Sequence, residues 1–218
     1  MKKLHKFALA VSSLALFVSP AIADDFGIFG SGLVLDFNGT KTLYEITLAG
    51  DSRLTPSSPP TINSTSAAAF SAGTLNLGTF DTVAGDSLKF VGGDILTYKH
   101  GYNVDFTQVN LSIDGGSYTS ISLNWDTDLG GGGDQRWYTQ TGGTGLNLLS
   151  GLSEGVHTLH VYFDAHSDST SSYAYDNNSN IPGNYQATFT VVPEPSSLVL
   201  VLGSMFFGGS YLARRKHS

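Results

Sequence analysis

Three aspartates in the segment NWDTDLGGGGDQRW stand close enough along the chain to share one hard cation: Asp126, Asp128 and Asp134. Carboxylates at alternate positions of a turning backbone supply the oxygen ligands that Ca²⁺ prefers. If Asp126 is position one of an EF-hand loop, Gly130 falls at the fifth position and Trp137 at the twelfth. Both depart from the EF-hand pattern, which has a ligand at the fifth position and a glutamate at the twelfth. The segment is therefore a candidate calcium site, although a solvated Gly/Asp turn is the favoured interpretation.

A second polar cluster lies in the segment DAHSDSTSSYAYDNNSN, which contains Asp164, His166, Asp168 and Asp176. Histidine and aspartate at alternate positions can hold a transition metal. A strand end that runs into a polar loop has the same composition, and this interpretation is favoured. The cluster is therefore kept as a metal candidate beside the simpler explanation.

Aromatic side chains near both clusters can stack on sugar rings. The candidates for glycan contact are Trp137, Tyr138, Tyr173 and Tyr175. An aromatic ring offers a large apolar face, which binds a sugar when it is exposed and anchors a core when it is buried. Packing in the core or at a sheet edge is the favoured interpretation. Trp125 is in phase with Leu123 and is expected to face the core.

No catalytic motif stands out in the sequence. It contains no H-E-x-x-H pattern, and its aspartates fall in separate turns. Its one G-x-S-x-G match, at 151–155, runs directly into a stretch with strand-like alternation, whereas the hydrolase motif stands at a strand-to-helix turn. Catalysis of these kinds requires a nucleophile with its base, or paired acids in one cleft. The absence of cysteine excludes disulfides, cysteine-based metal sites and a thiol nucleophile. We therefore expect no enzyme and no cofactor, with calcium at the aspartate segment as the exception to test.

Residues 24–192 are strongly acidic. The whole chain has 11 lysines and arginines and 18 aspartates and glutamates. Six of the basic residues and one of the acidic residues lie outside 24–192, which leaves 5 basic and 17 acidic residues and a charge near −12. Such a surface repels nucleic acid and anionic lipid, so no nucleic-acid partner is expected.

Apolar and polar residues alternate along several short stretches, as they do in half-buried strands. In QVNLSIDGGSYTSISLNW two alternating runs flank the DGG triplet at 114–116. Asp-Gly and Gly-Gly favour positive φ, so this segment predicts an antiparallel hairpin. SLKF and ILTYK flank the GGD triplet at 92–94 and predict a second hairpin. The segment 55–73 contains three prolines and predicts an irregular loop.

Strands of this kind recur through residues 24–192, and runs of strong helix formers are missing. This pattern predicts one all-β domain, built as an antiparallel β-sandwich with a jelly-roll-like arrangement as one version. No repeat of fixed period is evident, which argues against a solenoid or a propeller.

The first 23 residues have the order of a secretory signal peptide. Lysines at positions 2, 3 and 6 precede an apolar stretch at 7–18, which is too short to span a bilayer comfortably. Pro20 follows, and Ala21 and Ala23 provide the small residues that signal peptidase requires. We expect cleavage after Ala23, so that the mature chain begins at Asp24 and has left the cytoplasm.

The C-terminal segment 196–213 has the length and composition of a transmembrane helix. It contains no charged residue over 18 positions, and as a helix it would be about 27 Å long, close to the ~30 Å hydrocarbon core. Arg214, Arg215 and Lys216 follow at once. If the body is exported, these charges stay on the cytoplasmic side, as the positive-inside rule prefers.

Just before this segment stands the triplet Pro193-Glu194-Pro195, within V-P-E-P. The triplet, the single apolar segment and the terminal basic cluster together resemble the PEP-CTERM sorting signal of Gram-negative bacteria. A segment of this kind is also labelled an ice-binding protein C-terminal domain, which is a name and not an activity. The resemblance covers residues 193–218 only, and the body domain resembles no family we know.

The resemblance implies handling by an exosortase, a membrane-embedded cysteine protease, after signal peptidase has acted. Pro193, Glu194 and Pro195 would be the recognition element, and Arg214, Arg215 and Lys216 the basic stop signal. The implied route is a transient inner-membrane anchor followed by release to the cell envelope or the outside, often in association with exopolysaccharide.

The expected function is accordingly that of an exported, exosortase-sorted surface or extracellular-matrix protein with a non-enzymatic β-sandwich body. Two alternatives stay open. The first is a lectin-like carbohydrate-binding module, which requires exposed aromatic rings. The second, less favoured, is a small secreted hydrolase, which requires polar side chains that meet in a pocket.

Overall fold

The computed structural model describes residues 25–47, 61–63, 65–100, 102–130, 133–140, 145–167, 171–178 and 184–192 of the 218-residue chain. The predicted signal peptide, sorting triplet, transmembrane segment and basic stop signal lie outside these residues, as does Asp168. No helix among the described residues is long and apolar enough to cross a membrane.

The described residues form strands and one short helix, as expected for an all-β domain. The strands are β1 (Asp25–Phe37), β2 (Thr40–Thr47), β3 (Thr61–Asn63), β4 (Leu75–Asp81), β5 (Leu88–His100), β6 (Val104–Ile113), β7 (Thr119–Leu123), β8 (Trp125–Gly130), β9 (Asp134–Gln140), β10 (Leu146–Asn147), β11 (Gly155–Ser167), β12 (Ser172–Asp176) and β13 (Tyr185–Val192). The helix is α1 (Ser66–Ser71).

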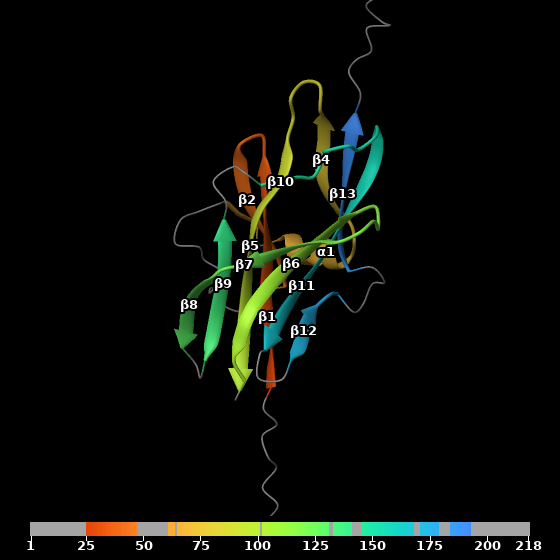
Figure 1. Cartoon of the computed structure of the whole chain (residues 1–218). Helices are drawn as coiled ribbons and strands as arrows, with labels where there is room; N and C mark the ends of the chain where they lie inside the picture. Colours follow the sequence, from red (N-terminus) through yellow and green to blue (C-terminus); the bar gives the residue numbers. More distant parts are fainter. Residues whose placement is uncertain are drawn as a thin grey trace, which may run out of the picture.

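Two sheets make a β-sandwich-like body (Figure 1). The first sheet has the order β3-β2-β1-β5-β9-β8, with β10 beside β5. The second sheet has the order β4-β13-β11-β6-β7, with β12 beside β11. Most pairs are antiparallel, but β3 runs parallel to β2 and β4 runs parallel to β13. The prediction of an all-β fold is thus confirmed.

Alternate residues of the strands face inward and fill one shared core. On β11 the side chains of Leu159, Val161 and Phe163 are fully buried, while the residues between them face outward. Leu33 and Leu35 of β1 join the same core from the first sheet. Because each sheet has one apolar face, packing the two faces together removes both from water.

The hairpin predicted around residues 114–116 is confirmed. It joins β6 to β7, with Val109 opposite Ile121 and the turn closed at Asp114 (φ 53°) and Gly115 (φ 70°). Both turn residues have the positive φ that the DGG triplet favours.

The second predicted hairpin, at the triplet 92–94, is wrong. β5 runs unbroken from Leu88 to His100 and carries Gly92 in its interior. A Cβ on Gly92 would lie 1.8 Å from the carbonyl oxygen of Thr139 on β9. Glycine is therefore needed there for close approach of two strands and does not mark a turn.

The irregular loop predicted for 55–73 is wrong from residue 61 onward. This part contains β3 and helix α1, whose Phe70 is fully buried in the core. A short helix is stable here because its aromatic anchor enters the core, which outweighs the low helix propensity of so short a segment.

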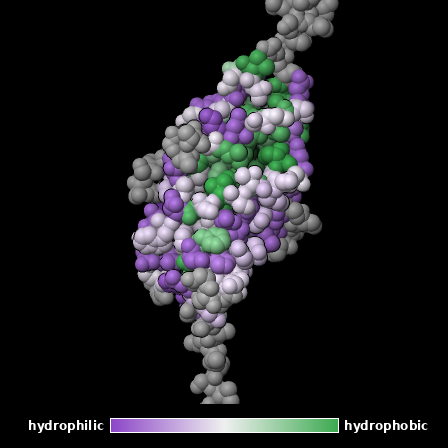
Figure 2. Space-filling view, in the orientation of Figure 1, coloured by the Kyte–Doolittle hydropathy of each residue, from purple (hydrophilic) through white to green (hydrophobic). Residues whose placement is uncertain are grey.

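The core is open to solvent at one place on the face seen in Figure 2, where apolar residues gather in the upper half. There β10 and the β6–β7 hairpin border a pocket of about 290 Å³. Its apolar lining consists of Leu111, Ile113, Leu146, Leu148 and Leu152, and its polar lining comes from serine, threonine and asparagine residues.

Candidate functional site

The three candidate calcium ligands lie on a hairpin of the first sheet and not in an irregular loop. Asp126 and Asp128 are exposed on β8, and Asp134 begins β9. Among the residues that the structure describes, no three His, Asp or Glu side chains form a group able to hold a metal ion. Asp126 instead lies 3.9 Å from Arg136, measured from Oδ2 to Nη1. Calcium binding by these aspartates stays a prediction that the geometry does not support.

Arg136 is held by a buried carboxylate on the outer face of the first sheet. Its Nε donates to Asp94 Oδ1 at 3.0 Å and its Nη2 donates to Asp94 Oδ2 at 2.5 Å, so the pair is bidentate. Burial raises the pKa of Asp94, and the two hydrogen bonds from Arg136 oppose that shift. This ion pair holds β5 against β9.

Tyr138, a candidate for glycan contact, belongs to the same structural cluster. The guanidinium carbon of Arg136 lies 4.9 Å from the centre of its ring. The ring also packs against Val34, Leu43 and Val91, and its hydroxyl donates to Gln140 Oε1. Its ring faces are used within the fold, so Tyr138 is a poor platform for a sugar.

Of the two tryptophans, Trp137 agrees with the favoured interpretation of core packing, and the prediction for Trp125 is wrong. Trp137, a candidate for glycan contact, is only 6% exposed and belongs to the core. Its Nε1 donates to Thr97 Oγ1 at 3.3 Å. Trp125, expected in the core, is 53% exposed. The alternation fails because the chain leaves the second sheet after Leu123 and enters the edge of the first sheet at Trp125.

The other two glycan candidates, Tyr173 and Tyr175, are exposed as that role requires. They lie on β12 with 48% and 58% of their surfaces accessible. Their ring centres are 6.0 Å apart and their planes differ by 17°. Side chains two apart on a strand share a face, so the two nearly parallel rings stand next to each other on the outside of the second sheet.

These tyrosines belong to a larger set of rings, which we call the aromatic band. Each ring centre lies between 4.8 and 6.4 Å from the next. The members, in spatial order, are Phe106, His166, Tyr173, Tyr175, Tyr162 and Tyr118. Three of them are direct cross-strand neighbours, because the register pairs His166 with both Phe106 and Tyr173.

The sequence interpretation missed Phe106, Tyr118 and Tyr162 as members of this surface. One signal was available, since Tyr162 and His166 occupy the positions between the buried residues of GVHTLHVYF and its continuation. The positions of Phe106 and Tyr118 depend on how distant segments pair, which alternation within one strand does not give.

The second metal candidate is divided between two different environments. His166 Nδ1 lies 2.7 Å from Asp105 Oδ1 on the outer face. Asp176 accepts hydrogen bonds from Ser31 Oγ at 2.7 Å and from Tyr185 Oη at 2.5 Å, and so connects the two sheets. These side chains serve the fold at separate places, and they form no shared coordination site in the described part of the chain.

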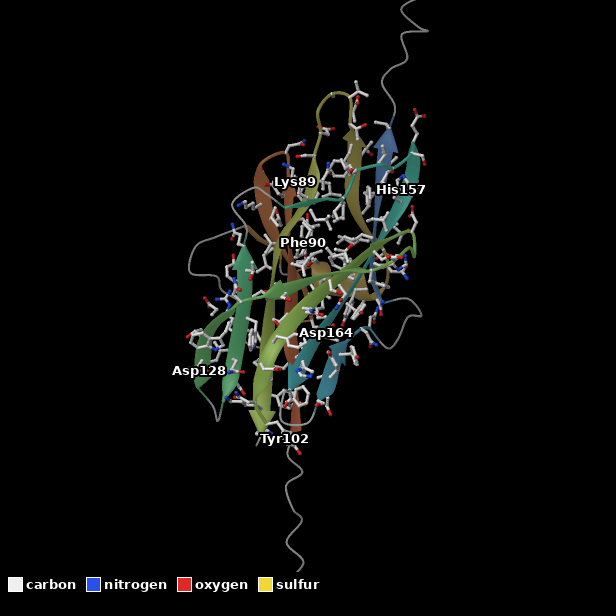
Figure 3. The ribbon with its side chains drawn as sticks, in the orientation of Figure 1. Lys89, Phe90, Tyr102, Asp128, His157 and Asp164 are labelled. Atoms are coloured by element: carbon white, nitrogen blue, oxygen red, sulfur yellow. The ribbon has the colours of Figure 1, made fainter. Side chains whose placement is uncertain are left out.

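Asp164, labelled on β11 in Figure 3, is buried beneath the aromatic band with only 4% of its surface exposed. Its Oδ2 accepts a hydrogen bond from Asn110 Nδ2 at 2.7 Å. Its Oδ1 is buried without a hydrogen-bond partner. Burial raises the pKa of Asp164, which the bond from Asn110 opposes. A buried carboxylate with one unsatisfied oxygen is unusual in a folded protein.

A shallow hollow of about 210 Å³ lies beside the band, lined by Tyr162, Tyr175, Asn177 and Asn184. Asn184 Nδ2 donates to the Tyr118 hydroxyl at 2.6 Å, which fixes the amide at the rim. Two aromatic rings and two amides therefore meet on the outer face of the second sheet.

No protein-family model matches the chain, and no curated protein matches it. What the described residues define is a β-sandwich-like body with one exposed aromatic face. Function is therefore argued from that face and from the sequence of the two ends of the chain.

Proposed function

We propose that this chain is an exported, exosortase-sorted surface or extracellular-matrix protein whose non-enzymatic body associates with exopolysaccharide. Residues 1–23 support export, and the PEP triplet, apolar segment and basic cluster of residues 193–218 support sorting. The sorting triplet is Pro193-Glu194-Pro195, and the partners that this route implies are signal peptidase and an exosortase-type protease.

We further propose that the sandwich is jelly-roll-like. The chain crosses between the sheets repeatedly, from β4 to β5, from β7 to β8 and from β9 to β11, and such crossings are typical of a jelly roll. The parallel pairs at the sheet edges are a departure from that pattern.

Carbohydrate binding is the activity of the body that the geometry supports best, and the exposed pair Tyr173 and Tyr175 is the observation that carries it. Nearly half or more of each ring is accessible, and the two planes are almost parallel. Exposing such apolar surface to water is unfavourable, and a sugar ring stacked on it recovers part of that free energy.

The pair lies far from the C-terminal end of the body. On β11, Gly155 pairs with Val191 near the end of β13, whereas Asp164 pairs with Tyr175. Nine residues of strand separate the two levels, which is about 30 Å at ~3.3 Å per residue. In Figure 1, β13 ends at the top of the view and β12 lies in the lower half. While the C-terminal segment anchors the chain in the membrane, the tyrosines would therefore lie about 30 Å from the membrane end of the body.

Sorting is tested by the intact mass of the protein in the inner-membrane, envelope and medium fractions of its native host. A mature form that starts at Asp24, ends near Pro193 and is recovered from envelope or medium supports the proposal. A form that still ends at Ser218 and stays in the inner membrane would make the tail a permanent anchor and the sorting proposal wrong.

Carbohydrate binding is tested with the mature protein and the exopolysaccharide of the same host, by affinity electrophoresis. The double variant Tyr173→Ala/Tyr175→Ala should lower the affinity at least about tenfold, as expected when two aromatic anchors are removed. Trp125→Ala is the matched control, because it removes an equally exposed ring from the other sheet. Equal losses in both variants, or no binding by the unaltered protein, would contradict the proposal.

A further inference from the structure

We infer that the hollow lined by Tyr162, Tyr175, Asn177 and Asn184 is a subsite for one neutral hexopyranose unit within a polysaccharide chain. The inference rests on the proposed association with carbohydrate and adds the place, the size and the charge class of the ligand. The hollow comes from β11, from β12 with the residue after it, and from the residue before β13.

The size of the hollow limits what it can hold. Its volume is about 210 Å³. Pockets for drug-sized ligands are about 300–1,000 Å³, so this hollow takes a smaller group, on the scale of a single sugar ring. It is open to solvent on the outer face of the second sheet, which allows the neighbouring units of a chain to extend away from it.

The walls supply both kinds of contact that a pyranose requires. Tyr162 and Tyr175 both line the hollow, with ring centres 6.4 Å apart and planes at 53°. Aromatic ring faces attract the apolar C–H face of a sugar. Each amide of Asn177 and Asn184 carries both a donor and an acceptor, which matches a hydroxyl group in either role.

The site is also held in place before any ligand arrives. Tyr118 packs edge-on against Tyr162, with centres 5.0 Å apart, and its hydroxyl accepts the hydrogen bond from Asn184 Nδ2. Asn184 has a φ of 73°, a left-handed conformation that asparagine tolerates better than most residues. A rigid subsite loses less conformational entropy on binding.

Asp164 adds an acceptor next to the two tyrosines. It is the cross-strand partner of Tyr175 and lies two residues after Tyr162 on the same face of β11. Its Oδ1 is buried and has no donor. That oxygen does not line the hollow, so a sugar hydroxyl donates to it only if the residues above it shift; such a bond would be favourable because it satisfies a group already removed from water.

Charge selects a neutral ligand. Neither the hollow nor the aromatic band contains lysine or arginine, and the carboxylates of Asp105 and Asp164 lie along the band. Residues 24–192 as a whole are near −12. A polyuronate or sulfated glycan would therefore be repelled, whereas a neutral glucan, galactan or mannan would not.

The aromatic band continues from the hollow across Tyr173 and His166 to Phe106. One ring fills the hollow, and further units of the same chain lie over these faces. Affinity should therefore rise with chain length, and a free monosaccharide should compete only at high concentration.

The test uses the mature protein, a neutral glucan, a neutral galactomannan and polygalacturonate, with isothermal titration calorimetry as the readout. Asn177→Ala/Asn184→Gly removes both amides, and glycine keeps the positive φ at position 184. Asn124→Ala is the control, because Asn124 is an exposed asparagine away from the hollow. Urea unfolding checks that each variant is folded.

We expect the double variant to bind at least one neutral polymer about tenfold more weakly than the unaltered protein and than Asn124→Ala. Unchanged affinity in the double variant, with binding still lost in Tyr173→Ala/Tyr175→Ala, would overturn the subsite and leave the proposed function standing. Tighter binding to polygalacturonate than to the neutral polymers would overturn the charge class. No binding to any of these polymers or to the host exopolysaccharide would overturn the proposed function and the subsite together.

Discussion

Asp94 and Asp164 occupy matching positions on the two sheets, and their surroundings differ. Each lies between core residues of a long strand, points to the outer face, and is at most 4% exposed. Both carboxylate oxygens of Asp94 accept hydrogen bonds from Arg136. Asp164 receives one hydrogen bond and keeps a buried oxygen without a donor.

The aromatic side chains near each carboxylate follow the same division. Around Asp94, Trp137 is in the core and Tyr138 is covered by Arg136 and an apolar cluster. Around Asp164, Tyr173 and Tyr175 are exposed. The groups around Asp94 are thus paired within the fold, whereas around Asp164 a carboxylate oxygen lacks a donor and two aromatic rings are exposed, as is typical of binding surfaces.

The largest effect is expected from Asp94→Asn. Removing one partner of a buried ion pair leaves Arg136 charged without its counter-charge, which costs about 3–5 kcal/mol of unfolding free energy. Asp126→Asn removes the exposed partner at 3.9 Å from the same guanidinium and should change stability by no more than about 0.5 kcal/mol. Urea unfolding of both variants measures the difference. Equal losses of stability would show that the buried pair with Asp94 contributes no more than the surface contact with Asp126.

The next effect concerns the two tryptophans. Trp137→Phe removes part of a buried ring and the hydrogen bond to Thr97, and should cost about 2 kcal/mol. Trp125→Phe alters a half-exposed side chain and should change stability by about 0.5 kcal/mol or less. Tryptophan fluorescence during urea unfolding reports both variants. A larger loss of stability in Trp125→Phe than in Trp137→Phe would mean that Trp125 is buried in the core, as its phase with Leu123 predicts.

Trp125 also shows where prediction from the sequence ends. The DGG triplet predicted the β6–β7 hairpin, and the alternation of buried and outward residues along β11 is equally visible in its sequence, because both depend on local geometry. The change of sheet after Leu123 resets the phase of alternation, and no local signal marks it. Gly92 was mistaken for a turn because close approach of two strands and a tight turn both require glycine.

The candidate site was predictable only in part. Tyr173 and Tyr175 were candidates for glycan contact from the sequence, although packing was the favoured interpretation, and the structure shows both of them exposed. The row Phe106, His166 and Tyr173 could not be identified, because three distant segments meet there through the sheet register. The partner of a buried carboxylate such as Asp94 is likewise a property of the fold.

A smaller effect is expected from Asp164→Asn. The raised pKa of Asp164 means that the folded state binds this proton more tightly than the unfolded state does. The contribution of protonated Asp164 to the free energy of unfolding is complete below the pKa of the unfolded state, near 3.9. It is lost as the pH rises through the pKa of the folded state. At pH 7 the neutral amide should therefore be about 1 kcal/mol more stable than the charged carboxylate. Urea midpoints at pH 7 and pH 4 measure this, and a variant that is less stable at pH 7 would show that Asp164 is satisfied after all.

The smallest effect concerns an acid that is exposed and yet fully paired. Asp114 Oδ2 lies 2.7 Å from His157 Nδ1, and Asp114 Oδ1 accepts the backbone N–H of Thr158 at 2.8 Å. His157 Nε2 lies 2.8 Å from the carbonyl oxygen of Ser153. Two acceptors on opposite sides of the ring favour the doubly protonated form, and the hydrogen bond to Asp114 is the main reason that the pKa of His157 is raised.

The sign of the resulting pH dependence is fixed by that shift. A histidine with a raised folded pKa contributes stability that is complete below the unfolded value near 6.5 and is lost as the pH rises through the folded value. His157→Gln should therefore lower the urea midpoint more at pH 5.5 than at pH 8.5, with a difference under about 1 kcal/mol. Asp114→Asn should flatten the same profile, and the double variant should add little to either single one, because both remove one interaction. A larger effect of His157→Gln at pH 8.5 than at pH 5.5 would mean that His157 is neutral in the folded protein. The contrast between Asp114, with both oxygens paired, and Asp164, with one oxygen unpaired, would then be wrong.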